Sequence, residues 1–183
     1  MIGRWIRKFI RDRRGTLALE TAFAVPVLAA LVLSGVEVTR YVLLNQKIER
    51  ASATMADLVS QAETLSEPDL ASLFTATGFV VDPFDLAVDG RLIVSSISTT
   101  GTAAAHVNWQ RGFGGGGGSS AFGVEGGDAV LPDGLVVRDG ESIIVGEAFF
   151  DFTPIFTGGV MGDTTVYNSA VLRPRFGSLT SLN

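Results

Sequence analysis

The feature that most constrains this chain is a run of 23 residues, Thr16–Val38, that contains only two charged side chains, Glu20 and Glu37. An α-helix of about 20 apolar residues is long enough to cross the hydrocarbon core of a bilayer. Pro26 lies inside the run, but membrane helices tolerate proline where neighbouring groups re-satisfy the freed backbone. The run therefore predicts one transmembrane helix over residues 16–38. A buried core helix is the alternative, and such helices usually have a shorter apolar run.

The charges beside this run predict its orientation. Six basic residues precede it and only Asp12 opposes them, whereas the charges that follow it are nearly balanced. The basic residues are Arg4, Arg7, Lys8, Arg11, Arg13 and Arg14. Lysine and arginine are retained on the cytoplasmic side of a membrane, so we expect the N-terminus to lie inside and the bulk of the chain outside.

Glu20 is unusual because an ionisable residue inside an apolar span is costly and indicates a functional contact. A competing interpretation is that its side chain reaches the head-group layer, about one helical turn away. Glu20 is the fifth residue after Gly15, which ends a basic leader over residues 1–15. A basic leader, a glycine and an apolar helix with this glutamate resemble the class III signal of type IV pilins.

This resemblance implies roles for three residues. Gly15 and Thr16 would form the processing site of a prepilin peptidase, which cuts after the glycine, and Glu20 would make the assembly contact. Cleavage would leave Thr16 with a new α-amine, and an amine attracts a carboxylate strongly in a low-dielectric setting. In this family the glutamate is thought to meet the N-terminus of a neighbouring subunit. Small residues along the span would pack against other pilin helices: Ala22, Pro26, Ala30, Ser34 and Gly35.

Beyond the span, apolar residues recur at alternating spacings of three and four from Tyr41 to Leu65. This period predicts an amphipathic helix over residues 39–66 that continues the span outward, giving one helix of about fifty residues. Ser66–Asp69 contains a proline suited to a first helical turn, so we expect a stop and a restart there. A short second helix, Asp69–Thr77, would then end at Gly78.

The period changes to that of strands after Gly90. We expect a hairpin of residues 91–98 and 103–110, then a strand pair, 135–137 and 142–153, joined by a turn at Asp139-Gly140, and a last strand at 164–172. The glycine-rich stretch 112–120 lacks the lysine-serine pair and frame of a phosphate-binding loop and predicts a mobile connector. Together these elements predict an α+β fold: a long N-terminal helix packed on an antiparallel sheet of about four strands, within a head domain over residues 67–183.

The C-terminal part adds to the resemblance. A strand ending in Phe149-Phe150-Asp151-Phe152-Thr153-Pro154, a linker, another strand and Arg173-Pro174-Arg175 look like the end of TadE-like proteins. The closest group is the TadE/TadF-like pseudopilins of tight-adherence (Flp) pilus systems. That implies a pilin-like fold in a single-pass inner-membrane protein with a periplasmic head. It also implies a role in pilus assembly, with other pilin subunits, the inner-membrane pilus platform and membrane lipid as partners.

Other function classes find little support in the sequence. The chain has no cysteine and one histidine, His106, which cannot by itself form a usual nucleophilic or zinc site. Asp82, Asp85 and Asp89 do not match a calcium-binding loop. From Ala51 onward the chain has five arginines and fifteen acidic residues, which gives a net charge of −10. Such a charge argues against nucleic-acid binding. We therefore expect no enzyme activity, no cofactor and no metal.

Two alternatives stay open. The first is an uncut, membrane-tethered periplasmic binding or adhesion module whose 112–120 loop and acidic surface contact the partner. Thr21 is compatible with it, because prepilins of this group often carry tyrosine directly after the glutamate. The second is a general secretion pseudopilin, although those proteins follow the glycine with phenylalanine and here Thr16 follows.

Overall fold

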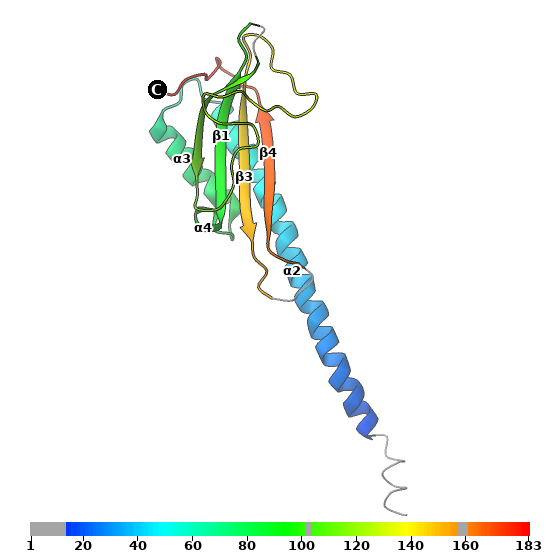
Figure 1. Cartoon of the computed structure of the whole chain (residues 1–183). Coiled ribbons are helices and arrows are strands. Elements are labelled where there is room, and N and C mark those ends of the chain that lie inside the picture. The colour runs from blue at the N-terminus through cyan, green and yellow to red at the C-terminus, as the bar shows by residue number, and fades with distance from the viewer. Residues whose placement is uncertain (1–13, 102–103, 157–160) are drawn as a thin grey trace, which may run out of the picture. The chain divides into compact units, whose positions relative to one another are not determined.

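A computed structural model describes residues 14–101, 104–156 and 161–183 and confirms the predicted α+β class (Figure 1). The predicted leader falls outside this part of the chain, apart from Arg14 and Gly15. The elements are, in order, α2 (Arg14–Ser60), α3 (Glu67–Gly78), the 3₁₀ turn η1 (Phe79–Val81), α4 (Leu86–Asp89), β1 (Gly90–Ser98), β2 (His106–Phe113), β3 (Ser142–Phe152) and β4 (Thr164–Leu172).

The chain divides into two compact units. One consists of residues 1–40 and 154–162, and the other of residues 41–153 and 163–183. The first contains the apolar part of α2 and most of the β3–β4 connection. The second, which we call the head, contains the C-terminal part of α2 and every other element.

The sheet has four antiparallel strands in the order β2-β1-β3-β4, as the sequence predicts in number and direction (Figure 1). The central β1–β3 pair runs without interruption from Gly90 opposite Phe150 to Ser98 opposite Ser142. β4 matches its predicted bounds, and β3 ends one residue before its predicted end. β2 begins and ends three residues later than predicted, and a bulge at Ser96/Ile97 interrupts its register with β1.

One face of the sheet packs on the C-terminal part of α2. The predicted apolar face of the helix is confirmed at Leu44, Ile48, Ala51 and Met55, each of which is fully buried. These side chains share a core with sheet residues Leu92, Val94, Ile144, Ala148 and Phe150. Toward the end of the helix the buried residue is Val59, and Leu58 is only half-buried. α2 ends at Ser60, short of the predicted boundary at residue 66, because residues 61–66 form the turn into α3.

The restart at α3 follows the predicted signals. Ser66 caps the helix: its hydroxyl accepts from the Asp69 amide, and the Asp69 carboxylate accepts from the Ser66 amide, which forms a capping box. The Ser66 hydroxyl also donates to the Asp69 carboxylate at 2.5 Å, and this bond, together with the one from the Ser66 amide, lowers the pKa of the Asp69 carboxyl. Pro68 lies in the first turn, and Leu70 and Phe74 face the core. Phe74 stacks on Phe113 of β2 with ring centroids 5.7 Å apart.

Two predictions for the 112–141 region are wrong. Residues 135–137 form no strand, because β3 already pairs with β1 on one edge and β4 on the other. Val137 instead packs on the second face of the sheet, in a cluster with Phe122, Ile143 and Val145. Both faces of the sheet are thus covered, one by helices and the other by the long β2–β3 connection.

The second wrong prediction is that the glycine-rich stretch 112–120 is a mobile connector. Hydrogen bonds fix this stretch to the rest of the head. The Gly115 amide donates to the Ala87 carbonyl at 2.8 Å, and the Gly116 amide donates to the Gly90 carbonyl at 2.9 Å. The Gly117 amide donates to the Asp151 carboxylate at 3.0 Å, which lowers the pKa of that carboxyl. A Cβ on Gly116 would lie 2.5 Å from the Asp89 carbonyl oxygen, so glycine is required here for close approach and not for mobility.

Candidate functional site

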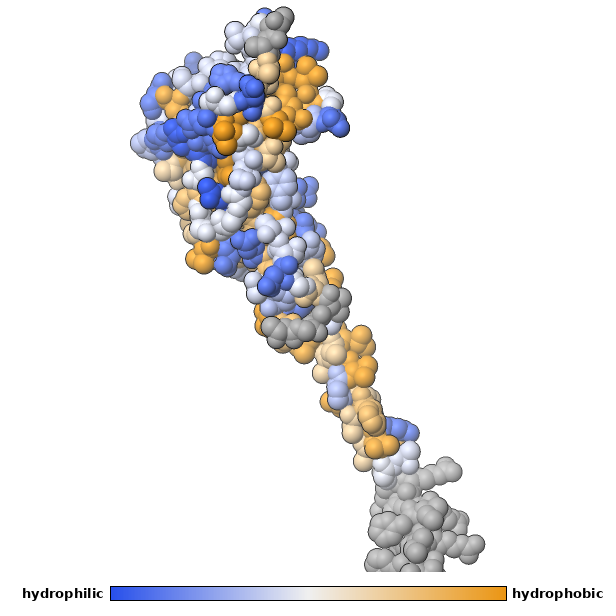
Figure 2. Space-filling view, in the orientation of Figure 1, coloured by the Kyte–Doolittle hydropathy of each residue, from blue (hydrophilic) through white to orange (hydrophobic). Residues whose placement is uncertain are grey.

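The first unit presents an apolar helical surface. Every residue from Gly15 to Leu33 is exposed, including nine large hydrophobic residues. These are Leu17, Leu19, Phe23, Val25, Val27, Leu28, Leu31, Val32 and Leu33. Figure 2 shows the apolar residues of this segment along the visible face of α2. A soluble protein rarely exposes so large an apolar surface, and such a surface marks a contact with a membrane or with another protein. By length and composition α2 is able to cross a membrane, and none of its most apolar stretch is buried.

Glu20 lies on this surface, exposed among apolar neighbours. Among the residues that the structure describes, none forms a hydrogen bond or an ion pair with its carboxylate. Thr21, the next residue, donates its hydroxyl to the Leu17 carbonyl at 2.8 Å and so satisfies itself within the helix. The partner that the predicted assembly contact requires for Glu20 therefore has to be a group outside the described residues.

The predicted processing site, Gly15-Thr16, lies among the first residues of the same helix that the structure describes. A Cβ on Gly15 would meet no atom within 4 Å, so no packing within the described chain requires glycine there.

Small residues recur every four positions along the apolar surface, at Ala18, Ala22, Pro26, Ala30 and Ser34. All are exposed except Ser34, which is half-buried. Pro26 has no amide hydrogen, so it cannot donate to the Ala22 carbonyl in the usual helical bond. A shallow apolar depression lies beside it. Gly35 is also exposed, with open space at its Cβ position. The helix thus carries a strip where another helix could approach closely.

Glu37 is a feature that sequence reasoning missed. Its side chain is 1% exposed, although it lies at the end of the apolar run. One carboxylate oxygen accepts from the amides of Ile155 at 2.8 Å and Phe156 at 3.2 Å, and the other pairs with Arg40 Nη1 at 3.3 Å. The start of the β3–β4 connection is thereby fixed to one turn of α2. The only sequence signal is an isolated glutamate at the edge of an apolar run, and nothing in it indicates a partner more than a hundred residues away.

Glu147 is the second buried carboxylate. It lies in the middle of β3 on the face opposite α2 and is fully buried. It accepts from the Ser120 hydroxyl, from the Ala121 amide at 2.8 Å and from the Tyr167 hydroxyl at 2.9 Å. Burial raises the pKa of Tyr167 to about 12, and the charge of Glu147 acts in the same direction. The carboxylate holds the β2–β3 connection on the sheet, which is a structural role.

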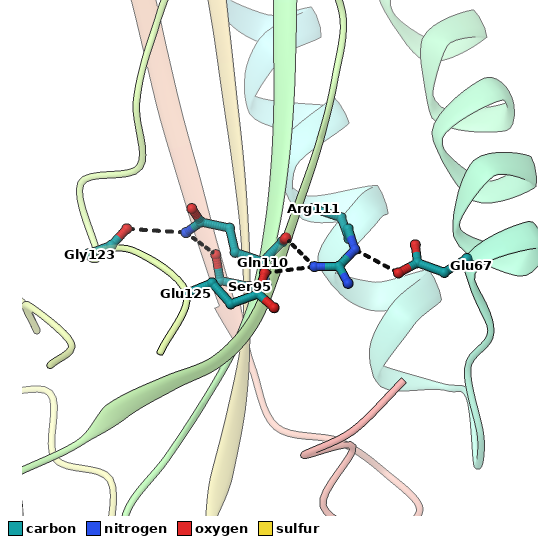
Figure 3. A network of polar contacts seen from close by, with 6 residues as sticks. All are labelled: Glu67, Ser95, Gln110, Arg111, Gly123 and Glu125. Carbon is teal, nitrogen blue, oxygen red and sulfur yellow. Dashed lines mark hydrogen bonds and ion pairs between the residues drawn. The ribbon is translucent and has the colours of Figure 1, made fainter. Parts of the chain in front are cut away.

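A surface network holds the same connection and α3 to β2 (Figure 3). Arg111 pairs with Glu67 of α3 at 2.7 Å and with Glu125 of the connection at 2.7 Å, and these carboxylates raise its pKa. The neighbouring Gln110 amide donates to Ser95 at 2.8 Å and to the Gly123 carbonyl at 3.2 Å. The hydrogen bonds and ion pairs of this network all join groups of the head, which is a structural role.

The remaining polar candidates have structural roles. Asp85 caps α4 by accepting from the amides of Ala87 and Val88. His106 is exposed at the start of β2 and forms an isolated bridge with Asp128. Within the described part of the chain, no three histidine, cysteine or acidic residues gather closely enough to hold a metal ion.

Comparisons with protein-family models, with curated proteins and with solved structures find no match to this chain. The exposed apolar segment of α2 with Glu20 is therefore the feature on which a functional hypothesis has to rest.

Proposed function

We propose that this chain is a membrane-anchored, pilin-like protein of the TadE/TadF type that takes part in assembling a tight-adherence (Flp) pilus. It acts by packing its N-terminal helix against the helices of other pilin or pseudopilin subunits, without catalysis. A prepilin peptidase cuts it between Gly15 and Thr16. Its N-terminus faces the cytoplasm, and its head lies in the periplasm.

The observation that carries this proposal is the exposed apolar part of α2, with one carboxylate that no described residue pairs. An apolar helix of this length is stable only in lipid or against other apolar helices. In lipid alone, Glu20 would be costly, whereas the α-amine of a neighbouring subunit would compensate its charge.

The alternative of a tethered binding module has less support. It assigns binding to the 112–120 loop, but the amides of Gly115, Gly116 and Gly117 already donate to the head. Ser120 likewise bonds to Glu147. A loop with its donors used internally has few left for a ligand.

Site-specific photocrosslinking in native membranes tests the helix packing. A photoreactive phenylalanine analogue would replace Ala30, on the strip of small residues, or Leu28, which is rotated by about 200° and lies on the opposite face. We expect adducts with pilin or pseudopilin subunits at position 30, and mainly lipid adducts at position 28. Adducts with lipid alone at both positions would refute subunit packing through this strip.

A further inference from the structure

The start of the β3–β4 connection is held beside the apolar helix by the side chain of Glu37. Glu37 accepts from the amides of Ile155 and Phe156 and also pairs with Arg40, so one carboxylate receives hydrogen bonds from two consecutive backbone amides. It is almost completely removed from solvent. Ile155 therefore lies beside Glu37, at the same position along the axis of α2.

That position coincides with the outer end of the predicted span. At a rise of 1.5 Å per residue, Glu37 lies about 32 Å along the helix from Thr16. The hydrocarbon core of a bilayer is about 30 Å thick. With Thr16 at the inner boundary, Glu37 and the two residues that it holds, Ile155 and Phe156, lie at the outer boundary, between hydrocarbon and head groups.

The connection has the composition that such a position requires. The sequence from Phe152 to Gly162 contains no charged residue. Ile155 exposes 61% of its surface although it is a large aliphatic residue. On α2, Val36 and Val38 flank Glu37 and are exposed as well. In the interfacial layer, apolar side chains of this kind are buried about 5–10 Å into the boundary between head groups and acyl chains.

We propose that the start of the β3–β4 connection, residues 153–156, is a second membrane contact, in which Ile155 inserts into the outer head-group layer of a phospholipid bilayer. Glu37 is the positioning residue: its carboxylate satisfies the amides that would otherwise enter the lipid boundary unpaired. This inference rests on the membrane anchoring in the proposed function, but not on pilus assembly. It adds a lipid contact at the periplasmic surface that the helix alone does not supply.

The chain has no cysteine, so single cysteines can be introduced and spin-labelled without removing any other. Three full-length variants would be reconstituted into phosphatidylethanolamine–phosphatidylglycerol vesicles: Ile155→Cys, Val136→Cys as a control in the head and Leu31→Cys as a control in the span. Val136 is 67% exposed and Leu31 is 64% exposed, so the three labels start from similar exposure in the protein. The readout is the collision rate of each nitroxide with molecular oxygen and with a water-soluble nickel chelate.

We expect the label at position 155 to collide with the nickel chelate severalfold less often than the label at 136, and with oxygen more often. Adding Glu37→Ala to Ile155→Cys should raise the nickel collision rate toward that of position 136, whereas Glu37→Gln should restore much of the protection because it keeps a carbonyl acceptor. Diluting the protein in lipid should leave position 155 protected. Protection that falls on dilution would identify a second copy of the chain, and not lipid, as the occupant.

Equal nickel collision rates at 155 and 136, with position 31 protected, would overturn the interfacial contact and leave the anchor intact. A label at 31 that also meets the nickel chelate freely would overturn both this inference and the membrane anchoring in the proposed function.

Discussion

Glu20→Ala is expected to leave membrane insertion unchanged and to reduce surface piliation about tenfold or more. Hydrogen bonds to charged groups contribute about 1.5–3 kcal/mol, and each 1.4 kcal/mol or so changes an equilibrium constant about tenfold. The variant removes the only carboxylate on the exposed apolar part of α2 and adds no new polar group. Counting pili by electron microscopy, beside quantification of the protein in membrane fractions, separates assembly from insertion.

Two further variants sharpen this result. Glu20→Gln keeps the size of the side chain and a hydrogen-bond acceptor but removes its charge. It therefore cannot form an ion pair with an α-amine and should also lose most piliation. Thr21→Val is the matched control, because among the described residues the Thr21 hydroxyl bonds only to the Leu17 carbonyl of its own helix. It should assemble normally. Normal piliation of Glu20→Ala would remove Glu20 from the assembly contact.

Gly146→Ala is expected to destabilise the head by about 3 kcal/mol, at the upper end of typical overpacking costs. Gly146 lies in β3 where the head part of α2 crosses the sheet. A Cβ there would lie 2.5 Å from the Ser52 carbonyl oxygen and 3.1 Å from the Ala56 amide nitrogen. Both neighbours are helix backbone, so the new methyl group can be accommodated only if the helix and the strand move apart.

Urea unfolding of the full chain in detergent micelles measures this effect. Trp109 is buried and donates to the Leu179 carbonyl, so its emission reports on the head when Trp5 is replaced by phenylalanine. Gly78→Ala is the control: it has a helical φ of −54° and open space at its Cβ position, and should unfold within about 0.5 kcal/mol of the parent or slightly later. An equally small effect of Gly146→Ala would show that α2 does not approach the sheet at this point.

The parts of the fold that depend on local periodicity could be predicted from the sequence. The unbroken helix through residue 60, the restart at Ser66 and the last strand follow from the apolar period, a capping box and β-branched alternation. Each of these signals is contained within a dozen or so neighbouring residues. Hydrophobicity also predicts the exposed apolar surface of α2, because a run of this length and composition is typical of a membrane span.

What could not be predicted depends on partners far apart in the sequence. Glu147 interrupts an apolar strand, and its alternation with Phe150 and Phe152 suggests a solvent-facing residue. It is fully buried because the β2–β3 connection covers that face and supplies two donors. Residues 135–137 have the composition of a strand, but both edges of β3 are occupied by other strands. Glu37 could not be predicted for the same reason, because the amides that donate to it, those of Ile155 and Phe156, follow β3 more than a hundred residues later.

The glycine-rich stretch shows a different limit of composition. Consecutive glycines indicate flexibility because they lower the cost of many backbone conformations. The same property lets the backbone approach another backbone closely, as Gly116 does at Asp89. The sequence alone does not distinguish these uses, and here the second one holds.

Intact-mass spectrometry of the protein extracted from native membranes, beside a Gly15→Ala variant, tests directly whether this chain is a processed pilin-like subunit. We expect a wild-type mass that starts at Thr16 and a variant that keeps its leader. A wild-type protein that still starts at Met1, in cells whose other prepilins are cut, would refute processing and favour the uncut, tethered module.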